Sequence, residues 1–140
     1  MFKKEEAWKN LDINNMGWEI WKQIKEYENI YHISNYGRIK ILKNNKIKKS
    51  RLLYNYVYIA LTKNSKPKNF RVHKLVIRHF LSEPPMHNSV VGHEDNNKNN
   101  NFIDNLYWTT SRENTLKAIS DRLLINDISE KDSQSIKVKV

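Results

Sequence analysis

A polar segment at residues 90–114 holds the side chains best suited to chemistry. His93 is followed by two carboxylates and a run of asparagines, and a further amide, Asn114, stands about twenty residues beyond it. Oxygen atoms of this kind suit a hard divalent cation, and a histidine titrates near neutral pH. The segment can therefore hold a divalent metal near a general base.

Two short strands and a helix are expected to position these groups. An apolar pair of valines forms a strand that delivers His93, and residues 106–110 form a return strand. Ser111 is a good N-cap and opens a helix over 112–124, in which Asn114 is the third residue. This order of strand, loop, strand and helix brings two distant residues to one place.

The N-terminal half predicts a small antiparallel sheet. Apolar and polar residues alternate over 31–41 around the turn Ser34–Gly37, which predicts a hairpin. Residues 54–62 are rich in aromatic and β-branched residues and form the best strand. Residues 73–81 have apolar side chains at helical spacing, so a short helix should close the sheet and stop before Pro84. Its two histidines are expected to be structural or to face phosphate.

The charge distribution indicates a polyanionic partner. The net charge is +10, and thirteen basic residues but no acidic one lie between Glu28 and Glu83. A segment with basic residues and no acidic ones repels itself in the folded state unless a polyanion such as nucleic acid binds it. Eleven of these bases fall on the expected strands and turns and are predicted DNA contacts: Arg38, Lys40, Lys43, Lys46, Lys48, Lys49, Arg51, Lys63, Lys66, Lys68 and Arg71.

Several classes of protein are disfavoured. The chain has no cysteine, so disulfides and thiolate zinc sites are excluded. Its start lacks the apolar region of a signal peptide, and it has no run of about 18 apolar residues that would predict a membrane span. We therefore expect an intracellular protein with no membrane partner.

These features resemble the HNH endonucleases of the phage and group I intron homing type, with the pattern (D/N)-H-x-D-G-N-K-x-N-N-x-x-x-N-L-x-W-x-T-x-x-x-N. The matching positions are His93, Asp95, Asn97, Lys98, Asn100, Asn101, Asn105, Leu106, Trp108, Thr110 and Asn114. The N-terminal half resembles the modular DNA-binding motif that accompanies such nucleases, through Trp21-Lys22-x-Ile24, Tyr27-Glu28, Tyr31-x-Ile33-Ser34-Asn35-x-Gly37-Arg38, Val72-His73-Lys74-Leu75-Val76 and Phe80. Together the two patterns extend over about residues 18 to 118.

The resemblance implies an α+β fold, with a small antiparallel DNA-binding sheet followed by a ββα-metal (HNH, His-Me finger) nuclease motif. It divides the chain into an N-terminal arm (1–17), which is a short helix or loosely docked, the sheet region (18–70), the nuclease region (71–124) and a tail (125–140), with one further strand expected near its end. The protein would be a monomer encoded by a phage or mobile element in a bacterial host.

The resemblance also implies a mechanism on double-stranded DNA, with nicking as the expected outcome. His93 would be the general base, Asn105 would brace the loop by hydrogen bonds, and Asn114 would bind one divalent cation, Mg²⁺ or Mn²⁺. The chain departs from the pattern at Gly92, where the family has an Asp or Asn that is the other protein ligand to the metal. Asn96 replaces a family glycine, which is milder because Asn tolerates left-handed backbone angles.

Three accounts of Gly92 are open. It is an engineered inactivating change, or it marks a natural degenerate nuclease that binds DNA without cutting it, or Glu94 or Asp95 supplies the missing oxygen. A different alternative is an RNA-binding module, since aromatic side chains on basic strands stack bases. The tyrosines concerned are Tyr54, Tyr56 and Tyr58, which we instead expect to pack on the core.

Overall fold

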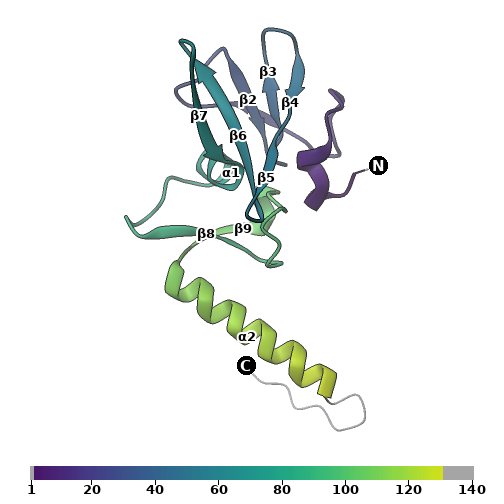
Figure 1. Ribbon diagram of the computed structural model, residues 1–140, viewed down its shortest axis with the longest axis vertical. Coiled ribbons are helices and arrows are strands. Elements are labelled where there is room, and N and C mark those ends of the chain that lie inside the picture. The colour runs from purple at the N-terminus through teal and green to yellow at the C-terminus, as the bar shows by residue number, and fades with distance from the viewer. Residues whose placement is uncertain (1, 131–140) are drawn as a thin grey trace.

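The structure is a computed structural model that describes residues 2–130, with side chains to residue 124. Within these residues the chain forms three antiparallel sheets and two α-helices (Figure 1). The first sheet has the order β1-β2-β3-β4, with strands Trp21–Gln23, Tyr31–Ser34, Ile39–Ile41 and Lys46–Lys48. β2 and β3 form the hairpin that the alternation predicts, and Gly37 takes a positive φ of 86° in its turn. A glycine meets this backbone requirement at no steric cost.

The second sheet is a three-stranded meander in the order β5-β6-β7, with strands Arg51–Leu53, Tyr56–Lys63 and Lys66–Arg71. Its turns consist of two residues each, and Tyr54 and Asn55 in the first turn both have positive φ, at 50° and 68°. Two left-handed residues are typical of the tight hairpin turn that suits twisted strands. The strand expected over 54–62 therefore begins two residues later.

The three tyrosines do not pack on the core, so that prediction is wrong. Tyr54 lies in the turn and is 90% exposed. Along β6 the side chains of Val57, Ile59 and Leu61 point into the core, so those of Tyr56 and Tyr58 lie on the opposite, half-buried face. This face also carries basic residues.

One hydrophobic core joins all three sheets. Helix α1 (Val72–Phe80) buries its apolar side against β6 and β7, and it also contacts β2, β8 and β9. Its buried residues join Ile33 and Ile39 from the first sheet with Val91 and Leu106 from the third. The nuclease-like hairpin is thus attached to the basic sheets through α1, and the core crosses the boundary expected at residue 70.

The N-terminal arm is fixed to the first sheet by a buried arginine. Arg38 is only 2% exposed, and its guanidinium donates to both carboxylate oxygens of Glu19, at 2.9 and 2.6 Å. It also donates to backbone carbonyl oxygens of Asn10, Asp12 and Asn14. The arm, which includes the 3-10 helix η1 (Lys4–Lys9), is therefore tightly docked. The predicted DNA contact at Arg38 is corrected, because its donors are buried and occupied.

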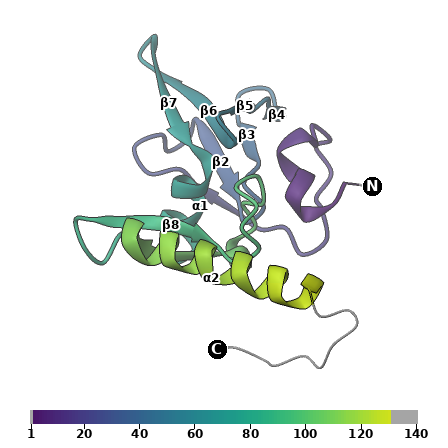
Figure 2. The same cartoon turned by 60° about the horizontal axis from the view of Figure 1, so that its bottom comes forward.

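The third sheet consists of β8 (Ser89–His93) and β9 (Leu106–Thr110), joined by a loop that ends in the short 3-10 helix η2 (Ile103–Asn105). Helix α2 (Ser111–Glu130) follows and contacts both strands, so the strand–loop–strand–helix order is observed (Figure 1). Figure 2 shows α2 running alongside β8.

The ends of α2 differ from the prediction. Thr110 rather than Ser111 caps α2, since its hydroxyl accepts the Glu113 N–H at 3.2 Å. The helix also continues past residue 124 to Glu130, and the strand expected in the tail lies outside the described residues. Among the residues described, no helix is long and apolar enough to cross a membrane.

Candidate active site and DNA interface

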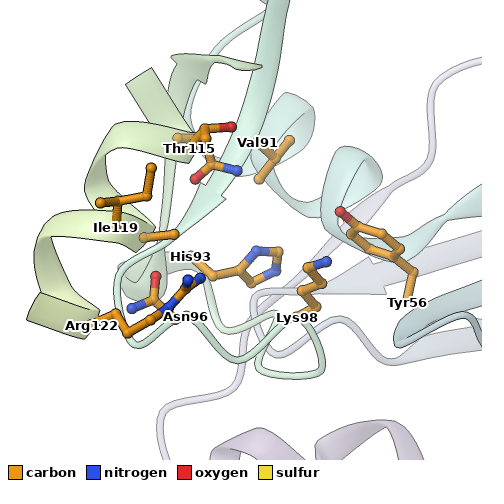
Figure 3. Close-up of a pocket in the computed structure, with 10 residues that line it drawn as sticks. Tyr56, Val91, His93, Asn96, Lys98, Thr115, Ile119 and Arg122 are labelled. Carbon is orange, nitrogen blue, oxygen red and sulfur yellow. The ribbon is translucent and has the colours of Figure 1, made fainter. Parts of the chain in front are cut away.

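His93 and Asn114 line the same open cavity of about 260 Å³. His93 ends β8, and Asn114 lies in the first turn of α2, so the ββα arrangement brings together two residues 21 positions apart. Figure 3 shows the His93 ring directed toward Lys98 and Tyr56, while side chains of α2 such as Arg122 form another wall. The cavity thus combines a histidine, the amides of Asn96 and Asn114, and two cations.

The His93 ring is held as a neutral base. The side chain is 6% exposed, and its Nε2 forms a 3.0 Å hydrogen bond with the Oδ1 of Asn101. Because an amide oxygen can only accept, Nε2 carries the proton and Nδ1 keeps its lone pair. Burial lowers the pKa of His93, although the bond to Asn101 opposes this effect. The ring is therefore unprotonated at neutral pH and can accept a proton at Nδ1.

Asn101 is a site residue that the sequence reasoning did not single out. It matches the family pattern, but no role was expected for it. The signal available was its position in the asparagine run, eight residues after His93. The loop contains several asparagines, and its fold decides which of them contacts the His93 ring. Only the structure shows that this residue is Asn101.

Asn105 ties the two ends of the loop together. Its Nδ2 donates to Asp95 Oδ1 at 2.9 Å and to the Asn100 carbonyl at 2.8 Å, while its own Oδ1 accepts the Asp95 N–H. Its carbonyl also accepts the Glu94 N–H at 2.8 Å. Burial would raise the pKa of Asp95, but the hydrogen bonds it receives lower the pKa overall and keep the carboxylate charged. Asp95 is thus occupied within the loop.

A second histidine lies behind the first. His73 on α1 is 3% exposed, and its ring centroid is 5.4 Å from that of His93 and 5.2 Å from that of Tyr56. Its Nδ1 is buried without a hydrogen-bond partner among the described residues. Burial lowers the pKa of His73 to about 3, and the nearby His93 adds to this. His73 is therefore neutral at neutral pH and packs beside His93, in line with the structural role expected for it.

Gly92 and the residue opposite it do not fit the metal site of the family. A Cβ atom at position 92 would lie 2.3 Å from Cζ of Tyr107, whose ring covers the glycine. Of the two ligand positions that the family pattern implies, residues 92 and 114, only Asn114 would then offer a side-chain oxygen. The described residues hold no group of three or more His, Cys, Asp or Glu side chains that could bind a metal ion. The position that the family pattern assigns to a second metal ligand therefore has no side chain in this protein, and Tyr107 fills the space beside it.

The outer face of the second sheet carries a basic and aromatic row that leads toward the cavity. Arg51, Tyr58 and Arg71 are paired across β5, β6 and β7, and Arg71 Nε donates to the Tyr58 hydroxyl at 3.0 Å. Two cations lie over the Tyr56 ring, with Arg71 at 4.6 Å and Lys98 at 4.9 Å from its centroid. Because Tyr56 and Lys98 also line the cavity, the row and the cavity form one surface.

Most of the predicted DNA contacts are accessible. Arg38 is buried, and Lys40 and Lys48 are half-buried. The exposed ones are Lys43, Lys46, Lys49, Arg51, Lys63, Lys66, Lys68 and Arg71. Their role in binding DNA remains a prediction.

Comparison with known proteins identifies relatives for both halves. The NUMOD4 motif matches residues 19–62. The chain is 42% identical over 103 residues to an uncharacterized HNH endonuclease, L245, of Acanthamoeba polyphaga mimivirus, covering 74% of this chain and 31% of that protein. It is 41% identical over 101 residues to the DNA endonuclease I-HmuI of Bacillus phage SP01, covering 71% of this chain and 58% of the phage protein. The chain thus spans about a third to somewhat over half of these relatives.

A solved structure shows the same fold. The structure entitled DNA binding and cleavage by the HNH homing endonuclease I-HmuI matches with a TM-score of 0.68 and 40% sequence identity, covering 75% of this chain and 60% of that one. The match confirms the α+β fold with antiparallel sheets, and the relatives confirm the resemblance found in the sequence. About three quarters of the chain is therefore similar to HNH endonucleases of the homing type, and a NUMOD4 motif matches its N-terminal half.

Proposed function

We propose that this chain is the DNA-binding and strand-cleaving part of an HNH homing endonuclease, in which His93 is the general base. The observation that carries the proposal is the His93 ring, held neutral by burial and oriented by Asn101, beside a cavity that continues into a basic surface. The Nδ1 of His93 would take a proton from the water that attacks a DNA phosphodiester. One DNA strand would be nicked.

The second sheet would place the DNA. Phosphate oxygens would contact the row of Arg51 and Arg71 and continue toward Lys98 at the mouth of the cavity. A row of cations suits a phosphate backbone, and the aromatic rings between them restrict the positions of the cationic groups. Binding of this kind releases counterions, so the affinity should fall steeply with salt.

HNH endonucleases generally use a divalent metal, and Mg²⁺ or Mn²⁺ is the ion we propose. Asn114 is the described residue that would offer it a side-chain oxygen. Since the Gly92 position offers none, we assign no step of the reaction to the ion. An intracellular, monomeric protein likewise remains our expectation.

A plasmid assay tests the role of the base. Supercoiled DNA is incubated with the chain and with His93→Ala in Mg²⁺ or Mn²⁺, and open circles are counted by electrophoresis. We expect His93→Ala to lower the nicking rate by about 10²-fold or more while the affinity for DNA stays within about threefold. Equal nicking by both proteins would exclude His93 as the base.

A second function has specific support. The Gly92–Tyr107 contact favours a protein that binds DNA and does not cut it, because a ligand position of the cation is missing. This alternative predicts salt-sensitive binding without open circles in either metal. Nicking by the unaltered chain that stops when the metal is chelated would rule the alternative out.

A further inference from the structure

Tyr107 and Gly92 face each other across the β8–β9 hairpin as a register pair. A Cβ built on Gly92 would lie 2.3 Å from Cζ, 2.5 Å from Cε2 and 2.7 Å from the hydroxyl oxygen of Tyr107, whereas Cβ atoms essentially never approach another atom within 3.0 Å. The end of the tyrosine ring thus occupies the space in which any side chain at position 92 would begin. Any residue larger than glycine requires the ring to move.

The ring of Tyr107 is half-buried in this position. Its hydroxyl oxygen is buried and has no hydrogen-bond partner among the described residues. Burial raises the pKa of Tyr107, so the phenol remains protonated at neutral pH. Lys117 on α2 donates to Asp121 at 2.7 Å and to the Glu94 backbone carbonyl at 3.2 Å. The charged side chains of Lys117, Glu94 and Asp121 all act on the phenol. A buried, unpaired hydroxyl is unfavourable, so the position is explained by packing on Gly92 and not by a polar contact of its own.

We propose that Tyr107 closes the metal-ligand position beside His93, so that residue 107, and not Gly92 alone, determines how well this chain binds a divalent cation. The inference rests on the proposed function, because the family pattern defines position 92 as a ligand position. It has a direct consequence for restoring that ligand. Gly92→Asp by itself introduces a carboxylate into space that the ring fills, whereas Gly92→Asp combined with Tyr107→Ala gives the carboxylate room.

The phenol could instead replace the missing ligand. Its oxygen lies 2.7 Å from the Cβ position of residue 92, and a carboxylate oxygen lies roughly 2.4 Å from its own Cβ. A neutral phenol is a poor ligand for a hard divalent cation, which prefers charged oxygens. Tyr107→Phe distinguishes the two roles, since it keeps the ring that closes the position and removes the oxygen.

Cation affinity without DNA is the decisive measurement. Mn²⁺ binding is titrated by electron paramagnetic resonance on the unaltered chain, Gly92→Asp, Tyr107→Ala, Tyr107→Phe and the Gly92→Asp/Tyr107→Ala pair. We expect the pair to bind Mn²⁺ at least about tenfold more tightly than Gly92→Asp, which is about 1.4 kcal/mol. Tyr107→Phe should leave the affinity unchanged. The proposal is overturned if Gly92→Asp alone binds as tightly as the pair, or if Tyr107→Phe weakens binding.

Thermal unfolding keeps the test valid if Gly92→Asp folds poorly. Gly92→Ala introduces only a Cβ, so it should lower the melting temperature, and Tyr107→Ala in the same chain should lower it less than the sum of the two single changes. Additive shifts would show that the ring does not press on position 92. Neither measurement uses DNA or cleavage, so failure of the proposed nuclease activity would leave these results unaffected and would be recognised separately in the plasmid assay.

Discussion

Acid should destabilise this fold through His73 in a pH range where carboxylates contribute little. The side chain is buried on α1 against His93 and Tyr56, and its pKa in the folded chain is about 3. In the unfolded chain the same ring has a pKa near 6.5. As the pH falls below 6.5, the unfolded chain takes up a proton that the folded chain does not, so the free energy of unfolding falls with pH.

The magnitude follows from the difference between the two pKa values. Each pKa unit corresponds to 1.36 kcal/mol, so about 2 kcal/mol is lost between pH 6.5 and pH 5, and at most about 5 kcal/mol by pH 3. Burial also lowers the pKa of His93 and that of His79, so these side chains act in the same direction. A comparison with a variant is therefore needed to isolate His73.

The variant is His73→Phe, which keeps a flat ring at a site where the histidine has no hydrogen bond among the described residues. Urea unfolding of both proteins at pH 7 and pH 5 gives the change in free energy for each. We expect the unaltered chain to lose about 2 kcal/mol more than His73→Phe over this interval. Equal losses would show that His73 is accessible to protons in the folded state, and the assigned burial would then be wrong.

Two further predictions concern residues whose roles became clear only in the structure. Arg38→Met should lower the free energy of unfolding by about 3–5 kcal/mol, because it leaves Glu19 buried without its partner. The control is Arg51→Met on the surface, which should change the free energy of unfolding by no more than about 0.5 kcal/mol and should weaken DNA binding in a filter assay. Asn101→Ala should lower the pKa of His93, followed by NMR, because burial lowers this pKa and the hydrogen bond to Asn101 raises it. Nicking should fall by about 10²-fold, because the ring loses the hydrogen bond that orients it. An unchanged His93 titration would contradict the role given to Asn101.

The elements of the fold follow from local patterns in the sequence. Alternation around Gly37 predicted the first hairpin, and helical spacing predicted α1 within one residue at each end. The errors occur where backbone chemistry competes with side-chain propensity. Tyr54 and Asn55 have strand-like neighbours, yet both adopt left-handed angles because a two-residue hairpin turn requires them. A propensity for strands does not reveal where a strand turns.

The charge pattern indicated a partner but could not assign each cation to a role. Arg38 stands among the other bases in the sequence, and its distinguishing feature is Glu19, nineteen residues earlier. Only the docked arm, with its three carbonyl acceptors, turns this arginine inward. Sequence charge therefore overestimates the DNA-binding surface wherever a base meets a buried carboxylate.

At position 92 of the candidate site, too, the sequence does not show which residue lies beside it. The spacing of the sequence pattern assigns His93, Asn114 and Gly92 to the site, so the absence of a side chain at position 92 is visible in the sequence. Tyr107 occupies a position that the family pattern leaves free, so its type carried no signal. Its effect arises from the register of β8 and β9, which places its ring over the glycine. The effect of a substitution at Gly92 therefore depends on residue 107, its partner across the hairpin, and the cation affinity that we propose for this site depends on both.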